Sequence, residues 1–152
     1  MQDADLSWAL SVEQRAYDFP WSQKGFENSL EQGLNYIFYS AEGQALGYCC
    51  ILPVLDEANI LNVCVAPEFQ GKGVARAAFL KVIEKLQESG FKMVLLEVRA
   101  SNTPAENLYK SLGFSKDGVR KGYYRANVWN DELMELVEER EDAILMSFAL
   151  AE

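Results

Sequence analysis

The sequence predicts one α+β domain, residues 1–152, in which helices flank a central sheet of mixed but mostly antiparallel strands. A strand–helix–strand unit lies in the middle of the chain, and neighbouring parallel strands need such a crossover. Strand runs joined by tight turns lie on both sides of this unit, which is typical of antiparallel hairpins. The 152 residues, 49% hydrophobic and 24% charged, are enough for one domain with a substantial core.

The first half of the chain is expected to form two helices and then three strands. Apolar residues at helical spacing predict a helix over 6–17, and Ser22 can cap a second helix that runs to about Gln32. The apolar runs that follow predict strands, separated by the short turns 41–44 and 56–57. These strands are 36–40, 45–54 and 58–65.

The second half is expected to contain a long helix, a short helix and three more strands. One face of the helix 74–89 is apolar, and Gly90 ends it. The segment Thr103-Pro104-Ala105-Glu106 matches a capping box with proline at the first helical position, so we expect a short helix from there to Gly113. The remaining strands are 93–98, 114–124 and 143–150.

A glycine-rich turn joins the strand that ends at Val65 to the long helix. Its sequence, Gln70-Gly71-Lys72-Gly73-Val74-Ala75-Arg76, leaves backbone N–H groups unpaired at a helix start, and such groups attract phosphate. Glycine also lets the backbone approach a ligand closely. A P-loop is excluded because Gly73 follows Lys72, and the dinucleotide fingerprint fails at Arg76. The alternative is an ordinary strand-to-helix turn.

The composition restricts the available chemistry. The chain has no histidine, which excludes histidine acid–base catalysis, histidine-bound metals and most hydrolase triads. The three cysteines, Cys49, Cys50 and Cys64, lack the spacing of a zinc site or of a disulfide framework. We interpret them as small buried residues, with Cys49 and Cys50 on opposite faces of one strand.

The charge pattern restricts the possible partners. A formal net charge of −9 argues against direct nucleic-acid binding and favours a cationic partner. We find no signal peptide, and the most apolar stretch, 46–55, is too short to span a bilayer. The sequence therefore predicts a cytoplasmic protein without a membrane partner, either a monomer or a weak homo-oligomer.

Four separated segments together resemble the GNAT family of N-acetyltransferases. They contain the motif Q-x-x-G-x-A in the glycine-rich turn and the strings L-E-V-R-A-S-N and L-Y-x-S-L-G-F. The segments are 61–67, 70–76, 96–102 and 107–114. The segments 13–22 and 140–146 resemble the RimI subfamily more closely. The resemblance implies the GNAT fold, acetyl-CoA as co-substrate and no metal. It also implies acetyl transfer, by direct amine attack, to the N-terminal alanine of a small-subunit ribosomal protein, which is offered as a basic peptide.

The resemblance also implies roles for single residues. Glu97 matches the general base that deprotonates the attacking amine, and Tyr109 matches the general acid that protonates the leaving thiolate. A structural strand-end carboxylate and a core aromatic are the alternatives for these two. The backbone of 63–65 is expected to pair with the pantetheine arm, and the turn 71–76 to hold the pyrophosphate. The predicted acetyl-CoA contacts are Val63, Cys64, Val65, Gly71, Lys72, Gly73, Val74, Ala75, Arg76 and Asn102. The alternative is a solvated cation for Lys72 and for Arg76, and a helix cap for Asn102, which is compatible with the contact.

The sequence indicates the identity of the acceptor less closely than that of the acetyl donor. By resemblance, the segments 19–21 and 123–124 flank the peptide groove, although such aromatic residues are common in cores as well. Acceptors other than a ribosomal N-terminus remain open: another protein N-terminus, a lysine or a small amine. A catalytically weak acyl-CoA-binding module is an alternative of a different class, and the presence of Glu97 and Tyr109 argues against it.

The chain departs from the family in two places. A strand that related enzymes carry at the N-terminus is expected to be short or missing before Leu6, which leaves the sheet edge open or covered by a partner. The connection 125–139 is longer than usual and strongly acidic, and Asn130 can cap a helical turn within it. We consider two interpretations of this connection: a solvated loop, and an acidic rim that attracts a basic peptide.

Overall fold

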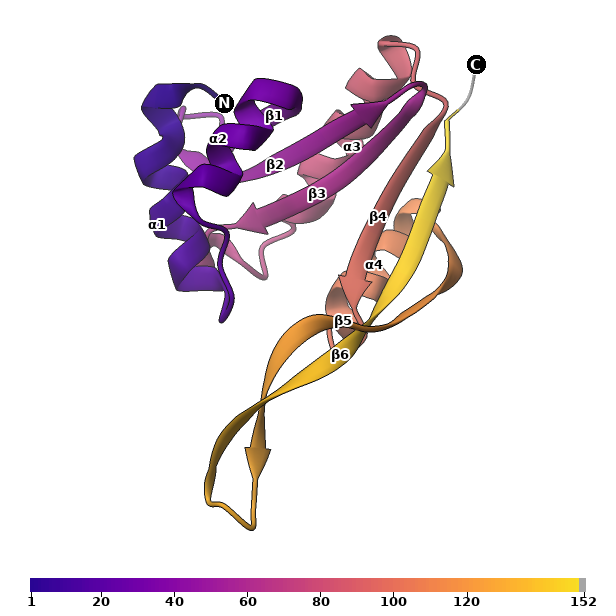
Figure 1. Cartoon of the computed structure of the whole chain (residues 1–152). Helices are drawn as coiled ribbons and strands as arrows, with labels where there is room; N and C mark the ends of the chain where they lie inside the picture. The colour runs from indigo at the N-terminus through magenta and orange to yellow at the C-terminus, as the bar shows by residue number, and fades with distance from the viewer. Residues whose placement is uncertain (151–152) are drawn as a thin grey trace.

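The computed structural model describes residues 1–150 and is centred on a six-stranded sheet (Figure 1). The strand order is β1-β2-β3-β4-β6-β5, and among these described strands only β3 and β4 are parallel neighbours. This confirms the predicted mixed, mostly antiparallel sheet. The strands are β1 Leu34–Tyr39, β2 Ala45–Val54, β3 Glu57–Val65, β4 Met93–Arg99, β5 Ser115–Asn130 and β6 Glu135–Ala149.

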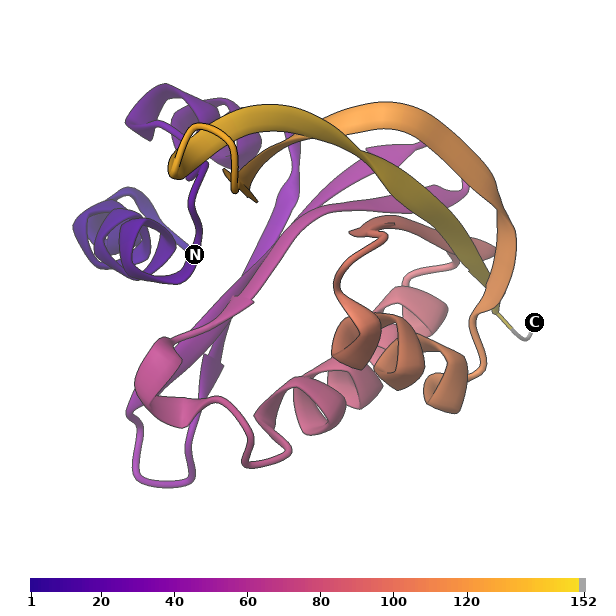
Figure 2. The same cartoon turned by 90° about the horizontal axis from the view of Figure 1, so that it is seen from below.

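Two pairs of helices cover opposite faces of the sheet (Figure 2). They are α1 Leu6–Ala16 and α2 Gln23–Gln32 on one face, and α3 Val74–Glu88 and α4 Thr103–Leu112 on the other. Strand β2 is buried between the two pairs, since Cys49 packs in the α3–α4 core and Cys50 packs in the α1–α2 core. This confirms that the two cysteines face opposite ways. No helix among residues 1–150 combines the length and the apolar character needed to cross a bilayer.

Strands β3 and β4 touch at only one end and then separate (Figure 1). Among the described residues, the pairing joins Glu57–Asn59 to Met93–Leu95 and extends no further. On its other side β3 stays paired to β2 up to Val65, but Leu61 has no partner between the pairs Ile51↔Ile60 and Cys50↔Asn62. An extra residue of this kind is a β-bulge, which bends and twists its strand. The bulge therefore accounts for the departure of β3 from β4, which opens a gap in the sheet.

The expected strand ends near 124 and 143 are wrong, because β5 and β6 continue as a long hairpin. The strands run to Asn130 and from Glu135, and they stay in register through pairs such as Trp129↔Leu136 and Val128↔Val137. The Asn130 Oδ1 atom accepts a hydrogen bond from the Leu133 backbone N–H at 2.9 Å, so this residue caps the tip turn as predicted. However, no helical turn follows it within the described residues. Cross-strand aromatic and β-branched pairs stabilise the hairpin instead.

Side-chain caps fix the starts of two helices. The Ser22 hydroxyl accepts from the Gly25 backbone N–H at 3.2 Å, which confirms Ser22 as the cap of α2. The capping box predicted at Thr103 is wrong by one residue, since the Asn102 Oδ1 atom accepts from the Ala105 N–H at 3.2 Å, which confirms the alternative role of Asn102 as a helix cap. Asparagine and threonine are both good N-caps, so spacing alone did not separate them.

The chain before α1 does not form a strand. Residues Asp3–Asp5 form a 3-10 turn, and the N-terminal ammonium of Met1 donates to the Asn35 carbonyl of β1 at 2.8 Å. Strand β1 is therefore the outermost strand on this side of the sheet. This agrees with the expectation of a short or missing first strand.

A buried carboxylate connects four segments on the α1 side of the sheet. The side chain of Glu13 is only 2% exposed. Its Oε1 atom accepts from the Tyr48 hydroxyl of β2 and, at 2.8 Å, from the Asn62 amide of β3. Its Oε2 atom accepts from the Trp21 backbone N–H at 2.9 Å, in the turn between α1 and α2. Buried carboxylates are costly unless they are fully hydrogen-bonded, and this one has a donor for each oxygen.

Replacing Glu13 with Ala is expected to lower the free energy of unfolding by about 3 kcal/mol or more, because the buried Tyr48 hydroxyl and two partly buried donors, on Asn62 and Trp21, lose their acceptor. Urea unfolding followed by circular dichroism measures this change. Glu84→Ala, at an exposed position on α3, is the matched control and should shift stability by less than about 0.5 kcal/mol. Equal stability of the two variants would show that the network around Glu13 contributes nothing to folding.

Candidate functional site

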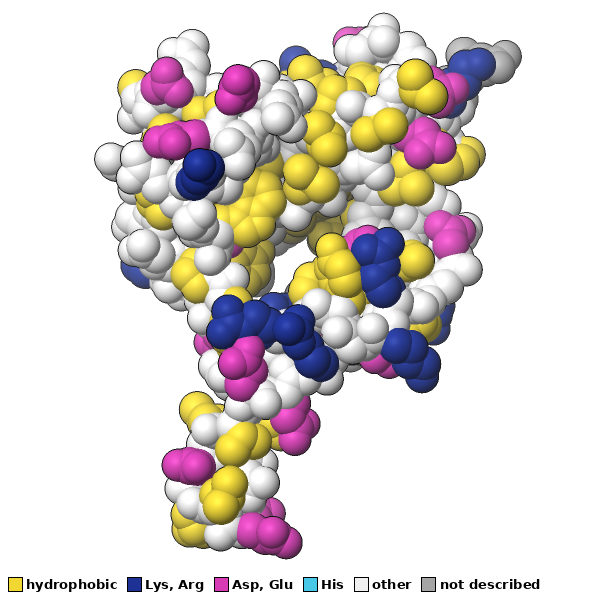
Figure 3. All heavy atoms as spheres, viewed as in Figure 1, with side chains coloured by type: hydrophobic (Ala, Val, Ile, Leu, Met, Phe, Trp, Pro, Cys, Tyr) yellow, Lys and Arg dark blue, Asp and Glu magenta, His cyan; other side chains and the backbone are white. Residues whose placement is uncertain are grey.

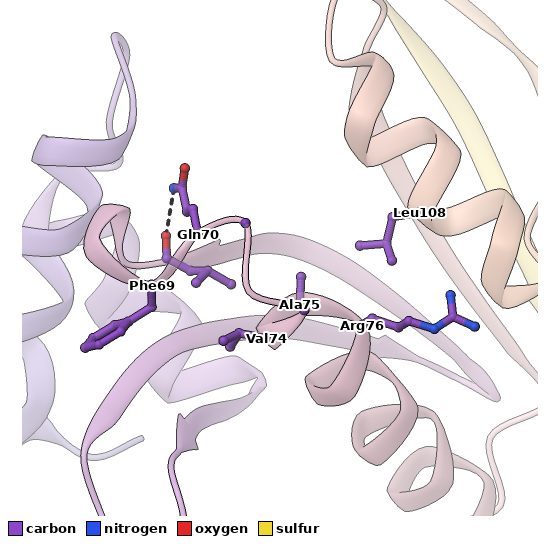
Figure 4. Close-up of a pocket in the computed structure, with 9 residues that line it drawn as sticks. Phe69, Gln70, Val74, Ala75, Arg76 and Leu108 are labelled. Atoms are coloured by element: carbon purple, nitrogen blue, oxygen red, sulfur yellow. Dashed lines mark hydrogen bonds between the residues drawn. The ribbon is translucent and has the colours of Figure 1, made fainter.

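The turn before α3 borders an open space (Figure 4). Gly73 is the N-cap of α3 with a φ of 78°, and Gly71 has a φ of 75°, so both are in the left-handed region that favours glycine. A Cβ built at either position would meet no atom within 4 Å. The cap residue offers no side-chain acceptor to the first turn of α3. The N–H groups there remain available to an anion, with the positive end of the helix dipole behind them.

A cavity of about 190 Å³ lies directly at this turn (Figure 4). Leu108 of α4 projects toward the turn and forms the opposite wall. The Gln70 side-chain amide donates to the Val65 carbonyl at 2.9 Å, which folds the turn back against the end of β3. The lining residues are Val65, Phe69, Gln70, Gly71, Gly73, Val74, Ala75, Arg76 and Leu108. The structure thus brings the end of β3 and most of the predicted phosphate turn into one pocket.

The two cations of the turn differ in their surroundings. The Arg76 guanidinium points toward α4 and donates to the Ser111 hydroxyl at 2.7 Å, so that it bridges α3 and α4 (Figure 4). The Lys72 ammonium lies 5.9 Å from the centre of the Phe69 ring, at the surface. Arg76 is therefore held in place by the protein, whereas Lys72 is positioned only by a weak cation–π contact.

The gap between β3 and β4 exposes the second half of β3 to a ligand. Past Asn59 the described pairing to β4 has ended, and the segment 63–65 forms one wall of the gap. The Tyr17 hydroxyl from the end of α1 donates to the Val63 carbonyl at 2.6 Å. Figure 3 shows a hollow between the two halves of the molecule, with hydrophobic side chains around it. An extended chain can lie along an unpaired strand edge of this kind.

The environment of Cys64 does not favour a role as a nucleophile. Its side chain is buried in the α1–α2 core, and burial is the first cause that raises the pKa of its thiol, to about 11. Burial also raises the pKa of Cys50, to about 12, and of Cys49. Because the thiolate is the reactive form, these cysteines are poor nucleophiles at neutral pH. This supports their interpretation as small buried residues. It also favours direct attack of an amine on the acetyl donor over covalent catalysis by a cysteine.

Glu97 and Tyr109, the two predicted catalytic residues, lie on different elements, β4 and α4. Along β4, Glu97 alternates with Val98 and Leu96, which are buried against α3 and α4, so its carboxylate lies on the opposite face of the sheet. There it pairs with the Arg120 guanidinium of β5 at 3.3 Å, and its side chain is 28% exposed. Burial, and then Glu97, raise the pKa of nearby Tyr124 to about 12.

Tyr109 is packed tightly on α4. Its ring lies between those of Phe79 and Phe114, with centroids at 5.2 and 5.7 Å. Burial, followed by the proximity of Cys49 and Tyr124, raises the pKa of Tyr109, so the phenol keeps its proton at neutral pH. No buried side-chain oxygen or nitrogen in the described part of the chain lacks a hydrogen-bond partner. The hydroxyl of Tyr109 forms no hydrogen bond within residues 1–150, so it is not sealed from solvent.

The two aromatic segments predicted to flank an acceptor groove lie close to each other. The Arg125 guanidinium of β5 stacks 4.4 Å from the centre of the Phe19 ring, in the turn between α1 and α2. At the base of the hairpin, Tyr123 and Tyr124 stack edge to face at 5.0 Å. Arg99 of β4 lies over the Tyr124 ring and also donates to the Arg125 carbonyl at 2.7 Å. The turn and the hairpin base therefore form one wall of aromatic and cationic groups.

Sequence reasoning missed several residues of this region. Tyr17 contacts the β3 edge, Glu13 holds the turn before α2, and Arg120 pairs with Glu97. Glu13 and Tyr17 both lie in the segment 13–22 that carried part of the family resemblance, so a signal was present. Nothing in the sequence indicated the role of Arg120, because the ion-pair partner of a charged residue on a strand is determined only in the folded sheet. Asn102, predicted to contact coenzyme A, lies at the α4 N-terminus and outside the lining of the cavity.

The comparisons with known proteins agree with this geometry. A family model described as the acetyltransferase (GNAT) family matches residues 5–114. The chain belongs to the GNAT family. It is therefore an acetyl-transferring enzyme, and this family uses acetyl-CoA as the donor.

Relatives of this GNAT enzyme match it over nearly its whole length. It is 36% identical over 153 residues to the ribosomal protein bS18-alanine N-acetyltransferase of Escherichia coli strain K12. The aligned region covers 99% of this chain and 95% of that protein. It is 33% identical over 129 residues to a putative bS18-alanine N-acetyltransferase of Bacillus subtilis, covering 84% and 85%. The crystal structure of the ribosomal-protein-S18-alanine N-acetyltransferase from Escherichia coli matches with a TM-score of 0.86 at 36% identity, over 100% of this chain and 92% of that one. Ard1 from Thermoplasma volcanium, at 21% identity and a TM-score of 0.78 over 100% and 95% of the two chains, shares the fold.

Proposed function

We propose that this GNAT enzyme transfers acetyl from acetyl-CoA to the N-terminal alanine of ribosomal protein bS18. The observation that carries the proposal is the 36% identity to the Escherichia coli bS18-alanine N-acetyltransferase over 99% of this chain and 95% of that protein. An acidic enzyme with a net charge of −9 also suits a basic acceptor, since opposite charges steer association. The partner in this proposal is the basic N-terminal peptide of a ribosomal protein.

The donor site that we propose follows the cavity and the open edge of β3. The pyrophosphate of acetyl-CoA binds the N–H groups of the turn 71–76, and Lys72 adds a charge at the surface. The pantetheine arm pairs with the backbone of 63–65 along the gap. Asn102 uses only its Oδ1 atom as a helix cap, so its Nδ2 group can donate to coenzyme A. Binding at these remote groups positions the thioester and reduces the entropic part of the barrier.

The proposed transfer is a direct attack with one base and one acid. Glu97 removes a proton from the acceptor ammonium, whose reference pKa is about 7.7–8.0, so a modest base is enough. The free amine attacks the thioester carbonyl carbon, a C–N bond forms, and the C–S bond breaks. The leaving thiolate takes the phenolic proton of Tyr109. The resulting phenolate takes the second proton that the new amide nitrogen loses, so that one proton in all is released, from Glu97 to solvent. The products are coenzyme A and the acetylated amine, and the buried thiol of Cys64 takes no part.

The first test is coenzyme A release from acetyl-CoA with a peptide that copies the bS18 N-terminus. Parallel reactions contain a peptide whose only amines are internal lysines, and a free polyamine. We expect turnover of the N-terminal peptide at a kcat/KM at least about a hundredfold above the other two, as for a site that recognises one amine by shape and hydrogen bonds. Acetyl-CoA binding without any turnover would point to an acyl-CoA-binding module instead.

Tyr109→Phe is expected to lower kcat about a hundredfold while the KM for acetyl-CoA stays within about threefold, because a general acid acts in the chemical step. Steady-state kinetics at saturating acceptor measures both constants. Tyr39→Phe, at an exposed position on β1, is the control and should leave both unchanged. An unaltered kcat in the Tyr109 variant would remove this residue from the acid role.

Glu97→Gln is expected to weaken acetylation most at low pH, where the acceptor amine is protonated and a base is required. The loss in kcat/KM should shrink by about tenfold as the pH rises from 6.5 to 9, since free amine then forms without help. A pH profile of both enzymes measures this difference, with Glu84→Gln on α3 as the control. Parallel profiles for Glu97→Gln and the unaltered enzyme would show that Glu97 is not the base.

A further inference from the structure

The outer part of the β5–β6 hairpin, residues 125–140, projects from the body of the molecule (Figure 1). We name this segment the distal hairpin. Figure 3 shows hydrophobic and acidic side chains gathered along it, with Lys and Arg side chains at its base. Its large apolar side chains are 40–72% exposed, and they are Val128, Trp129, Leu133, Met134 and Leu136. Apolar groups concentrated in this way on an exposed ribbon mark an interaction surface.

One face of the distal hairpin continues the wall of the acceptor region. Trp129 lies opposite Leu136 and Arg125 lies opposite Arg140, and these pairs share a face because side chains alternate along a strand. Arg125 on this face stacks on Phe19, in the turn that flanks the proposed acceptor site. The face of the hairpin that begins at this turn therefore carries Trp129 and Leu136 at positions farther from the body of the molecule. The pair Val128 and Val137 occupies the other face.

The charges at the outer end of this apolar surface are negative. Among the described residues, four acidic side chains of the distal hairpin form no ion pair. Asp131 and Glu132 lie in the tip turn, where the Asp131 carboxylate accepts from the Trp129 indole N–H at 2.9 Å. Glu135 and Glu139 alternate with Leu136 along β6 and so lie on the face of Val137. Glu138 is neutralised by Arg125. A second copy of this chain would bring two acidic hairpins together, in a protein whose net charge is already −9. A basic polypeptide with apolar side chains is the complementary occupant.

The distance along the hairpin indicates which part of such a polypeptide reaches this surface. Trp129 is four residues beyond Arg125, which corresponds to about 14 Å of strand. The first two or three residues of an acceptor that fill the site beside Glu97 and Tyr109 end well short of it. Residues further from the acceptor N-terminus, or the folded part of the acceptor protein, can make the contact.

We propose that the face of the distal hairpin formed by Trp129 and Leu136, with the acidic tip turn that follows Trp129, is a docking surface for a basic polypeptide segment downstream of the acceptor N-terminus. The inference rests on the proposed acetylation of a basic protein. Trp129 is the anchor, since tryptophan dominates such contacts, and the carboxylates bind lysine and arginine side chains. Docking there lowers the KM for a whole protein acceptor and leaves the chemical step unchanged.

The test uses the double variant W129A/L136A and, as matched control, V128A/V137A on the opposite face. Whole bS18 and a peptide of its first four residues are compared as acceptors. For W129A/L136A we expect the KM for whole bS18 to rise about tenfold, with kcat and the KM for the short peptide within about twofold, as for loss of a buried anchor outside the reacting site. The control should change neither. Equal effects on both acceptors, or an unchanged KM for whole bS18, would overturn the proposal.

Equilibrium binding separates this inference from the proposed activity. Calorimetry of whole bS18 with the enzyme needs no turnover, and we expect W129A/L136A to bind about tenfold more weakly than the unaltered chain. The variant D131N/E132Q should weaken binding and flatten its salt dependence without a change in apolar contact. Equal binding by all forms, or no binding by the unaltered chain, would refute docking. Analytical sedimentation measures whether the unaltered chain self-associates. If it does, and if W129A/L136A abolishes the self-association, the surface binds a second copy of the chain and the docking proposal is refuted.

Discussion

The separation of β3 from β4 is the constraint on which the rest of this structure depends. The two strands pair over only three residues each, and the bulge at Leu61 turns β3 away from its neighbour. If they paired along their whole length, the sheet would be continuous and would offer no strand edge to a ligand. The backbone of 63–65, which is paired to β2 but not to β4, and the glycine-rich turn that follows it both lie on the open side. One local irregularity therefore opens the gap in which we propose that donor and acceptor meet.

The two halves of the molecule on either side of the gap are held by different means. On the β1–β3 side, the buried carboxylate of Glu13 fixes the turn before α2 by accepting from Tyr48, Asn62 and the Trp21 backbone. On the other side, Arg99 ties β4 to both strands of the hairpin through the Arg125 carbonyl and the Glu141 carboxylate. The halves meet again where Arg125 stacks on Phe19. The proposed acceptor region is thus framed by polar and charged groups that are each hydrogen-bonded within their own half.

The hairpin shows most clearly where sequence reasoning was insufficient. The segment 125–139 has apolar residues at 133, 136 and 137, a spacing that also fits a helix, and acidic residues that fit a solvated loop. In the structure, Val128 faces Val137 and Trp129 faces Leu136, pairs that belong to a strand register. Cross-strand pairing joins residues on both sides of a turn, so a pattern within one strand does not reveal it. The error at Thr103 was smaller, since Asn102 and Thr103 are both able to cap a helix.

The sequence by itself determined the elements and the chemistry of this protein. Local signals, such as helical periodicity in α1 and α3, the Ser22 cap, and glycines at 71, 73, 90 and 113, placed most element boundaries within two residues. The absence of histidine and the motifs around Glu97 and Tyr109 narrowed the reaction to acetyl transfer. Only the tertiary structure decided that β3 and β4 diverge, that Glu13 is buried, that Arg120 pairs with Glu97, and that 125–139 forms a projecting ribbon. Each of these depends on contacts between residues far apart in the chain, whose free energy exists only once the sheet has formed.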